Sequence, residues 1–157
     1  MKVIIGPYTN YNKKTKKTPP RKISVKIDKY DTWSMDHTLS HIIVPMLIQL
    51  KKTKQGIPND MLTEEYNKLC TSMDYHLEKE NGPLHKKEKA LFKEAIKKWN
   101  DILDKMIWSF KEIRSDHKGE NKFWKKDSFD NEGHKEYYKR VNEGTELFGK
   151  YYMNLWD

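Results

Sequence analysis

The sequence predicts an α+β fold that is mainly helical. We expect a bundle of three long helices, with a short helix and an N-terminal two-stranded β-hairpin laid against it. Two patterns indicate this class. Apolar and polar residues alternate near the N-terminus, which is typical of strands with one covered face. After residue 31 the apolar residues recur every three or four positions, the period of an amphipathic helix. Residues 1–157 are predicted to form a single domain around one core.

The strongest helical signal lies in the middle of the chain. Its large apolar side chains follow one another at steps of four, three, four and three: Trp99, Leu103, Met106, Phe110 and Ile113. This spacing places them on one face of a helix, and we expect that face to form the core. The helix is predicted to begin near His85 and to end at Arg114.

Two short apolar segments predict the hairpin. Residues 2–5 (KVII) precede a Gly-Pro turn, and residues 23–27 alternate between apolar and polar side chains. The connection at residues 11–22 carries six basic side chains and no acidic one: Lys13, Lys14, Lys16, Lys17, Arg21 and Lys22. Six like charges and two prolines do not pack well together, so a mobile basic loop is expected here.

The first long helix is predicted to be capped by Thr32 or Ser34 and to be kinked at Pro45. Its expected buried face consists of four apolar residues at steps of four, three and four: Leu39, Ile43, Met46 and Leu50. A shorter helix follows from Thr63 to about Cys70, and residues 71–85 are predicted to be a connection.

The last long helix is predicted to begin near Gly133, after a loop at residues 120–135 that folds back onto the body. Its expected buried face contains five residues: Val141, Thr145, Phe148, Tyr152 and Leu155. Gly144 and Gly149 lower the helix propensity, so we expect them to permit close contact with another helix.

Composition limits the possible classes of protein. The formal charge of +8 falls to +2 when the six basic residues of the loop are set aside, so most of the chain is nearly balanced. No apolar run reaches the length of about 20 residues that a membrane helix needs, and the N-terminal apolar run is too short for a secretory signal. The single Cys70 excludes an internal disulfide framework and is compatible with a reducing cytosol.

Three stretches of the chain stand out: IGPY at residues 5–8, IDKYDTWSMDHTLSHIIVPMLIQLKKTKQG at residues 27–56, and WNDILDKMIWSF at residues 99–110 together with the closing RVNEGTELFGKYYMNLWD at residues 140–157. Together they resemble a family of small proteins encoded by tailed bacteriophages. Members of that family vary most in the connection after IGPY, which is a basic loop in this chain. The resemblance implies a viral accessory protein in the cytoplasm of a bacterial host, and it assigns neither a catalytic residue nor a cofactor.

Aromatic rings together with basic side chains favour a phosphate-bearing ligand. Rings stack on nucleobases, while lysine and arginine neutralise phosphate. We therefore expect an anionic small molecule, of nucleotide type, or a host protein as the partner. The candidate ligand-binding residues are Tyr8, Trp33, Asp36, His37, Lys51, Lys54, Asp104 and Arg140.

His37 and His41 are four residues apart on a predicted helix, so their imidazoles could meet one metal ion, with Asp104 as a third ligand. The simpler interpretation is a pair of ordinary histidines bonded to their neighbours. Motifs of nucleophilic hydrolases and of phosphate-binding loops are absent from the sequence.

Three functions remain open. The leading hypothesis is a non-enzymatic viral accessory protein that binds a host component and sequesters a nucleotide-type signal against host defence. The first alternative is a nucleic-acid-binding protein that uses the basic loop, and the second is a metal-dependent enzyme. We also expect a homo-oligomer, because a two-stranded hairpin leaves strand edges with unpaired backbone groups.

Overall fold

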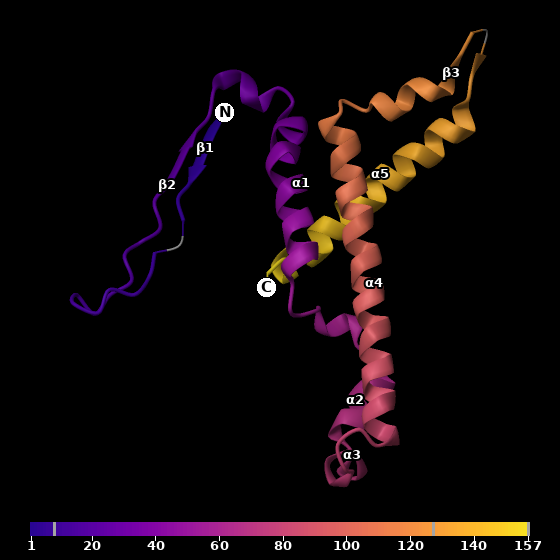
Figure 1. Cartoon of the computed structure of the whole chain (residues 1–157). Coiled ribbons are helices and arrows are strands. Elements are labelled where there is room, and N and C mark those ends of the chain that lie inside the picture. Colours follow the sequence, from indigo (N-terminus) through magenta and orange to yellow (C-terminus); the bar gives the residue numbers. More distant parts are fainter. Residues whose placement is uncertain (8, 127, 157) are drawn as a thin grey trace.

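Three long helices form the body of the protein, as expected from the sequence. The computed structural model describes residues 1–7, 9–126 and 128–156 (Figure 1). The longest helix, α4 (Pro83–Arg114), runs through the centre and packs most extensively against α5 (Asn131–Tyr151) and α1 (Met35–Thr53). Proline at the first turn suits the start of α4, because its missing N–H is not needed there.

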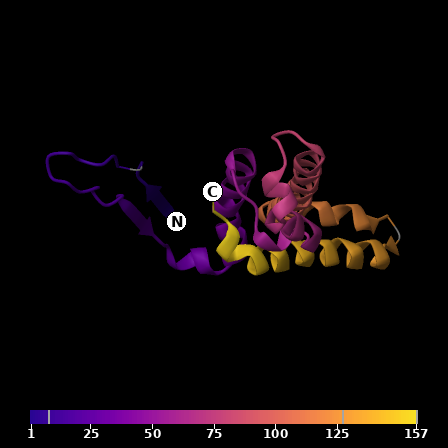
Figure 2. The ribbon, with the colours of Figure 1, turned by 90° about the horizontal axis from the view of Figure 1, so that it is seen from below.

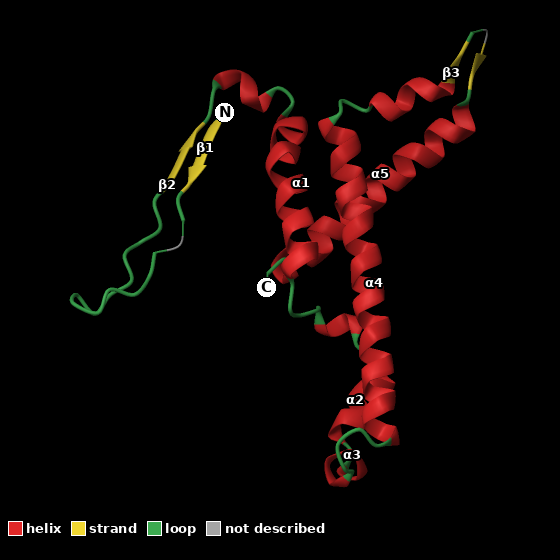
Figure 3. Ribbon diagram, viewed as in Figure 1, coloured by secondary structure: helices red, strands yellow, loops and turns green. Residues whose placement is uncertain are grey.

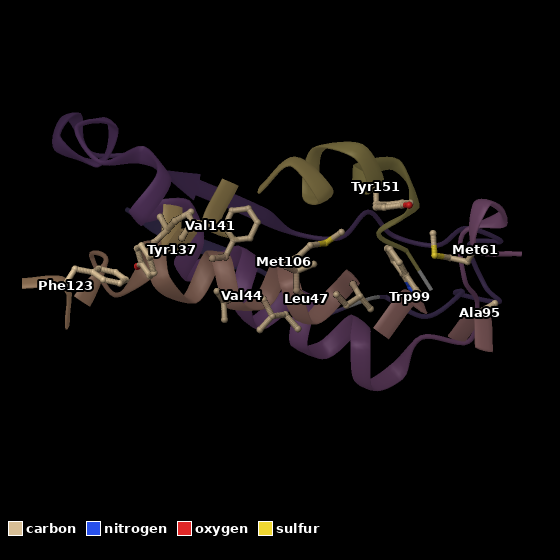
Figure 4. Packing of buried hydrophobic residues seen from close by; sticks show 14 residues of the cluster. Val44, Leu47, Met61, Ala95, Trp99, Met106, Phe123, Tyr137, Val141 and Tyr151 are labelled. Atoms are coloured by element: carbon tan, nitrogen blue, oxygen red, sulfur yellow. The ribbon is translucent and has the colours of Figure 1, made fainter. Parts of the chain in front are cut away.

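The core lies along one face of α4, and the spacing rule places it correctly. Trp99, Leu103, Met106, Phe110 and Ile113 are all buried. Figure 4 shows Trp99 and Met106 of this face among labelled residues of α1 and α5, with Met61 at the Trp99 end of the cluster. The indole of Trp99 meets the ring of Tyr151 edge-on, with centroids 5.2 Å apart. The aromatic side chains thus supply much of the contact between α4 and α5.

The buried face of α1 agrees with the predicted face only in part, since Ile43 and Leu50 are half-buried and pack against the core. Leu39 and Met46 are 41% and 62% exposed, whereas the buried residues of the helix are Ser40, Val44 and Leu47. The spacing of apolar residues does not indicate this face, because Ser40 is polar and is left out of the apolar pattern. In the structure it donates a hydrogen bond of 2.7 Å to the Asp36 carbonyl, so its burial leaves no polar atom unsatisfied.

Helix α1 follows Ser34 at its N-cap position, although the serine side chain makes no capping bond there, and Pro45 lies inside the helix. The buried residues of α5 are Tyr137, Val141, Gly144 and Tyr151. Tyr152, predicted to be buried, is 63% exposed, because α5 ends at Tyr151 and the chain tightens into the 3₁₀ turn η4 (Tyr152–Asn154).

Gly144 and Gly149, two of the three glycines of α5, differ in their surroundings. A Cβ atom at Gly144 would lie 2.0 Å from the Ser109 hydroxyl and 2.6 Å from the Lys105 carbonyl oxygen on α4. Close approach between the helices therefore depends on the missing side chain at this position. At Gly149 a Cβ would meet nothing within 4 Å, so the prediction of a close contact is confirmed for Gly144 and wrong for Gly149.

The segments between the long helices contain more regular structure than the sequence predicts. The predicted short helix is α2 (Glu64–Thr71), and residues 71–85 contain a further one-turn helix, α3 (Met73–Leu77). The Ser72 hydroxyl caps α3 by accepting a hydrogen bond from the Tyr75 amide. Serine in a polar segment is also typical of a loop, so the sequence did not predict this helix. The turn η2 (Asn59–Met61) connects α1 to α2.

The segment expected to be a loop at residues 120–135 contains three short elements and the start of α5. It includes the end of η3 (Lys118–Phe123) and the two strands β3 (Trp124–Lys125) and β4 (Ser128–Phe129), which pair antiparallel. Asp130 caps α5 by accepting a hydrogen bond from the Gly133 amide, so the helix begins two residues earlier than predicted.

The N-terminal hairpin consists of β1 (Lys2–Ile5) and β2 (Ile23–Lys26). It joins the body through η1 (Lys29–Thr32), whose N-cap residue Asp28 accepts from the Tyr30 amide. Figures 1 and 2 show the hairpin projecting away from the helices instead of lying against them. Figure 3 shows the same separation between the strands of the hairpin and the helical body.

Candidate functional site

The C-terminal end of α4 and the N-terminal part of α5 enclose a cluster of rings, which we call the aromatic–histidine cluster. The chain leaves α4 through Asp116 and His117, both with positive φ, and the His117 amide donates to the Glu112 carbonyl. This reversal brings η3 and the β3–β4 pair back over α5. The cluster consists of His117, Phe123, Phe129, His134, Tyr137 and Tyr138.

Two tyrosines of the cluster donate hydrogen bonds to glutamates. The Tyr137 hydroxyl lies 2.9 Å from Glu112 Oε2, and the Tyr138 hydroxyl lies 3.1 Å from Glu120 Oε2. Burial, followed by the nearby Glu112 carboxylate, raises the pKa of Tyr137 above its ordinary value. Burial and the bond to Glu120 also raise the pKa of Tyr138. Both phenols therefore stay protonated and act as donors at neutral pH.

Glu120 also accepts from a histidine of α5. The Nε2 atom of His134 lies 2.8 Å from Glu120 Oε1, and this bond is the main reason why the pKa of Glu120 is below its ordinary range. No buried side-chain polar atom of the described residues lacks a hydrogen-bond partner. The cluster is therefore a closed network that attaches η3 and the β3–β4 pair to the body.

A groove along α5 begins beside this cluster. It is lined by aromatic, basic and acidic side chains: Lys105, His134, Lys135, Glu136, Tyr138, Lys139, Arg140, Asn142, Glu143 and Glu146. Its lysines are ion-paired. Lys105 lies 2.5 Å from Glu143, while Lys135 and Lys139 pair with glutamates three residues before them on α5. These pairs keep the groove close to electrically neutral apart from Arg140.

Arg140 differs from the lysines of the groove. Its guanidinium carbon lies 3.8 Å from the ring centroid of Trp108, a cation–π contact between α5 and α4. Among the described residues, no carboxylate lies within ion-pair distance of it. A guanidinium carries its N–H donors as a planar fork, which suits carboxylate or phosphate oxygens.

Apart from Tyr8, the other predicted ligand-binding residues lie on α1, next to its N-terminus or against it, and they are spread along the helix. Trp33 precedes the helix, is 85% exposed, and meets the ring of Tyr30 edge-on with centroids 5.9 Å apart. Asp36 is exposed in the first turn of α1. Tyr8 lies outside the described residues.

Lys51 and Lys54 lie at the far end of α1. Lys51 Nζ lies 2.6 Å from both carboxylate oxygens of Asp104, and Lys54 Nζ lies 2.5 Å from Asn100 Oδ1. Eighteen residues separate Trp33 from Lys51, which corresponds to about 27 Å along a helix axis. One nucleotide therefore cannot contact both ends, and the predicted residues do not form one pocket within a single chain.

His37 and His41 lie side by side on α1, with ring centroids 5.0 Å apart and planes inclined at 80°. Asp104, considered as their third metal ligand, pairs with Lys51 at the other end of the helix. In the part of the chain that the structure describes, no three side chains of the types His, Cys, Asp and Glu lie together in a metal-binding group.

The basic loop forms a turn at the tip of the hairpin. The Asn12 amide donates to the Lys17 carbonyl over 2.9 Å, and the Lys14 amide donates to the Asn12 side chain. Near the strands, Arg21 Nε donates to the Gly6 carbonyl. The lysines of the turn are exposed, at the point of the hairpin farthest from the helices (Figure 1).

Sequence reasoning did not single out Trp108, His134 and Tyr138 as neighbours of a ligand site. His134 and Tyr138 are four residues apart and therefore share a face of α5, so their spacing was a usable signal. The contact of Arg140 with Trp108 joins two helices and has no counterpart in local spacing. No helix of the described residues is long and apolar enough to cross a membrane. Comparison with protein-family models, curated proteins and solved structures found no match to the chain.

Proposed function

We propose that the chain is a non-enzymatic viral accessory protein that binds an anionic host molecule of nucleotide type. The proposal rests on one observation, the position of Arg140 in the groove of α5. Its guanidinium lies on Trp108 and has no carboxylate partner among the described residues, so it is available to an anion. The binding would take place in the cytoplasm of the bacterial host.

The groove offers the two kinds of contact that a nucleotide needs. Arg140 supplies a forked donor for a phosphate group, and the rings of His134 and Tyr138 line the same groove for contact with a base. Lys105 and Lys139 add positive charge when their pairing glutamates turn away. Binding without turnover is enough to sequester a signalling nucleotide, which is the counter-defence role that we propose.

Isothermal titration with adenosine monophosphate tests the proposal, with inorganic phosphate as the probe for charge alone. We expect Arg140→Ala to weaken nucleotide binding at least tenfold, because a charge-assisted bidentate contact contributes about 1.5–3 kcal/mol. Arg140→Lys keeps the charge but loses the fork, so we expect an intermediate affinity.

The matched control is Lys97→Ala, which removes one exposed positive charge from α4 outside the groove. Its affinity should equal that of the parent protein. Equal losses in Arg140→Ala and Lys97→Ala would indicate an effect of net charge only. Failure of the parent protein to bind nucleotide, or full affinity in Arg140→Ala, would contradict the proposal.

A nucleic-acid-binding function is the second candidate, and one observation favours it. The turn at residues 12–17 presents four exposed lysines at the tip of the hairpin: Lys13, Lys14, Lys16 and Lys17. Replacing them together by alanine should lower affinity for single-stranded DNA and flatten its dependence on salt, since fewer counterions are then released. A salt slope unchanged by the four substitutions would exclude the loop as the contact.

A further inference from the structure

The hairpin is the least enclosed part of the protein. Ile4, Ile5, Ile23 and Val25 are each about half exposed, and Ile27 beyond the end of β2 is exposed to the same degree. The strands project away from the helices in both views (Figures 1 and 2). An isolated two-stranded hairpin is marginally stable in water, and a third strand or a covering element is needed to stabilise it.

The register divides the hairpin into two different faces. Val3 pairs with Val25 and Ile5 with Ile23, so these four side chains share one face. Lys2 pairs with Lys26 on the other face, where Ile4 faces Ser24. The first face is wholly aliphatic, and the alternation along β2 adds Ile27 to it.

The register also fixes which backbone groups of β2 point outward. The Gly6 amide donates to the Lys22 carbonyl over 2.8 Å, which makes residues 6 and 22 a hydrogen-bonded pair. Antiparallel bonding alternates along a strand, so the even-numbered residues of β2 bond to β1. The N–H and C=O groups of Ile23, Val25 and Ile27 therefore point toward the open edge.

We propose that this edge of β2 pairs antiparallel with the same edge of a second copy of the chain, about a two-fold axis at Val25. In this register Val25 of one copy faces Val25 of the other, and Ile23 faces Ile27. All of these residues direct their backbone groups outward, so each pair can exchange both hydrogen bonds. The hairpins then form a four-stranded sheet with one continuous aliphatic face.

Charge complementarity supports a second copy as the occupant. In the same register Lys22 of one copy faces Asp28 of the other, and the symmetry makes this contact twice. Ser24 faces Lys26, so no like charges stand directly opposite each other between Lys22 and Asp28. Opposite charges at facing positions stabilise antiparallel strands, whereas like charges there destabilise them.

The open edge of β1 is less suited to the same pairing. Its outward amides belong to Val3 and Ile5, and the next outward position is Pro7, which has no N–H. At its other end the N-terminal amine lies 2.7 Å from a carboxylate oxygen of Asp31. In Figure 1, β2 is also the strand on the side away from α1, where a second copy has room to approach.

Two proline variants test which edge is used. Val25→Pro removes an outward N–H of β2, and Val3→Pro removes an outward N–H of β1, and neither group bonds within the hairpin. Light scattering from micromolar to millimolar concentration should give twice 18.9 kDa for the parent protein and for Val3→Pro, and a monomer for Val25→Pro. Circular dichroism should show the same helix content in all three proteins.

A disulfide test fixes the register. Facing residues of a hydrogen-bonded pair have Cα atoms about 5.5 Å apart, within the range that a disulfide spans. In a Cys70→Ser background, Val25→Cys should therefore form an intermolecular disulfide with oxidised glutathione. The control Ser24→Cys lies off the axis and should remain largely monomeric on a non-reducing gel.

The outcomes separate the proposal from its rivals. A parent mass of 18.9 kDa at every concentration overturns it, and so does a dimer that persists in Val25→Pro. A dimer lost in Val3→Pro but kept in Val25→Pro would assign the interface to β1. Equal crosslinking of Ser24→Cys and Val25→Cys would overturn the two-fold register.

Discussion

Replacing Gly144 or Gly149 of α5 by alanine makes the same chemical change in opposite surroundings. A Cβ atom at Gly144 would lie 2.0 Å from Ser109 Oγ and 2.6 Å from the Lys105 carbonyl oxygen, whereas at Gly149 it would meet nothing within 4 Å. The serine hydroxyl can rotate away, but the carbonyl belongs to the backbone of α4. Gly144→Ala therefore forces α5 away from α4, and Gly149→Ala does not.

The expected magnitudes have opposite signs. Alanine is favoured over glycine inside a helix by about 1 kcal/mol, and this gain applies at both positions. At Gly144 the overpacking cost is at the upper end of its usual range, about 3 kcal/mol, because a backbone atom blocks the new methyl group. Gly144→Ala should lose about 2 kcal/mol of unfolding free energy, and Gly149→Ala should gain up to about 1 kcal/mol.

Urea and thermal unfolding followed by circular dichroism measure both variants. A domain of this size shifts by about 2–4 °C per kcal/mol, so Gly144→Ala should melt about 4–8 °C below the parent protein. Adding Ser109→Ala should restore only part of this loss, since the contact with the Lys105 carbonyl remains. Melting temperatures that rise by similar amounts in both variants would refute the close approach of α4 and α5 at Gly144.

Three further substitutions test the core and the aromatic–histidine cluster. Trp99→Ala should cost about 3–5 kcal/mol in urea unfolding, because the indole is buried against Tyr151, and a loss below 1 kcal/mol would contradict its place in the core. Tyr137→Phe removes the donor to Glu112 and should cost about 1–2 kcal/mol, with no change in the urea m-value. Glu120→Gln tests the lowered pKa of this carboxyl, whose ordinary value is 4.5. The ionised Glu120 carboxylate stabilises the fold fully above about pH 5, and this contribution is lost as the pH falls through its folded-state pKa. The difference in unfolding free energy between Glu120→Gln and the parent protein should therefore shrink on acidification. A difference that does not depend on pH would exclude the lowered pKa of Glu120.

The helices of the body could be predicted because large apolar residues define their faces. In α4 the five residues of the pattern, from Trp99 to Ile113, are all large, apolar and buried, so the prediction is confirmed; it did not include Ser109, which is buried between them. In α1 the same rule was right for Ile43 and Leu50 but wrong for Leu39 and Met46, because Ser40 occupies a core position and is not apolar. A small residue at a close helix contact carries no hydrophobic signal, although its burial can be complete.

The candidate site could be predicted only in part. Among the predicted ligand-binding residues that the structure describes, only Arg140 lines the α5 groove, while Lys51 and Lys54 make contacts with α4. Sequence spacing describes neighbours on one helix, but the contact of Arg140 with Trp108 depends on how α4 and α5 cross. Residue types that suit a ligand were therefore recognised, whereas their grouping in space was not.

The alternation of apolar and polar residues in β2 continues one residue beyond the part of the strand that pairs with β1. Pairing with β1 ends at Lys26, which faces Lys2, yet the pattern adds the exposed Ile27 one position further. Within a single chain this side chain remains about half exposed. In the two-fold register Ile27 faces Ile23 of the second copy, and burying the exposed half of each such side chain contributes about 1 kcal/mol. The same register turns an exposed strand edge, which favours aggregation, into a closed and symmetric contact.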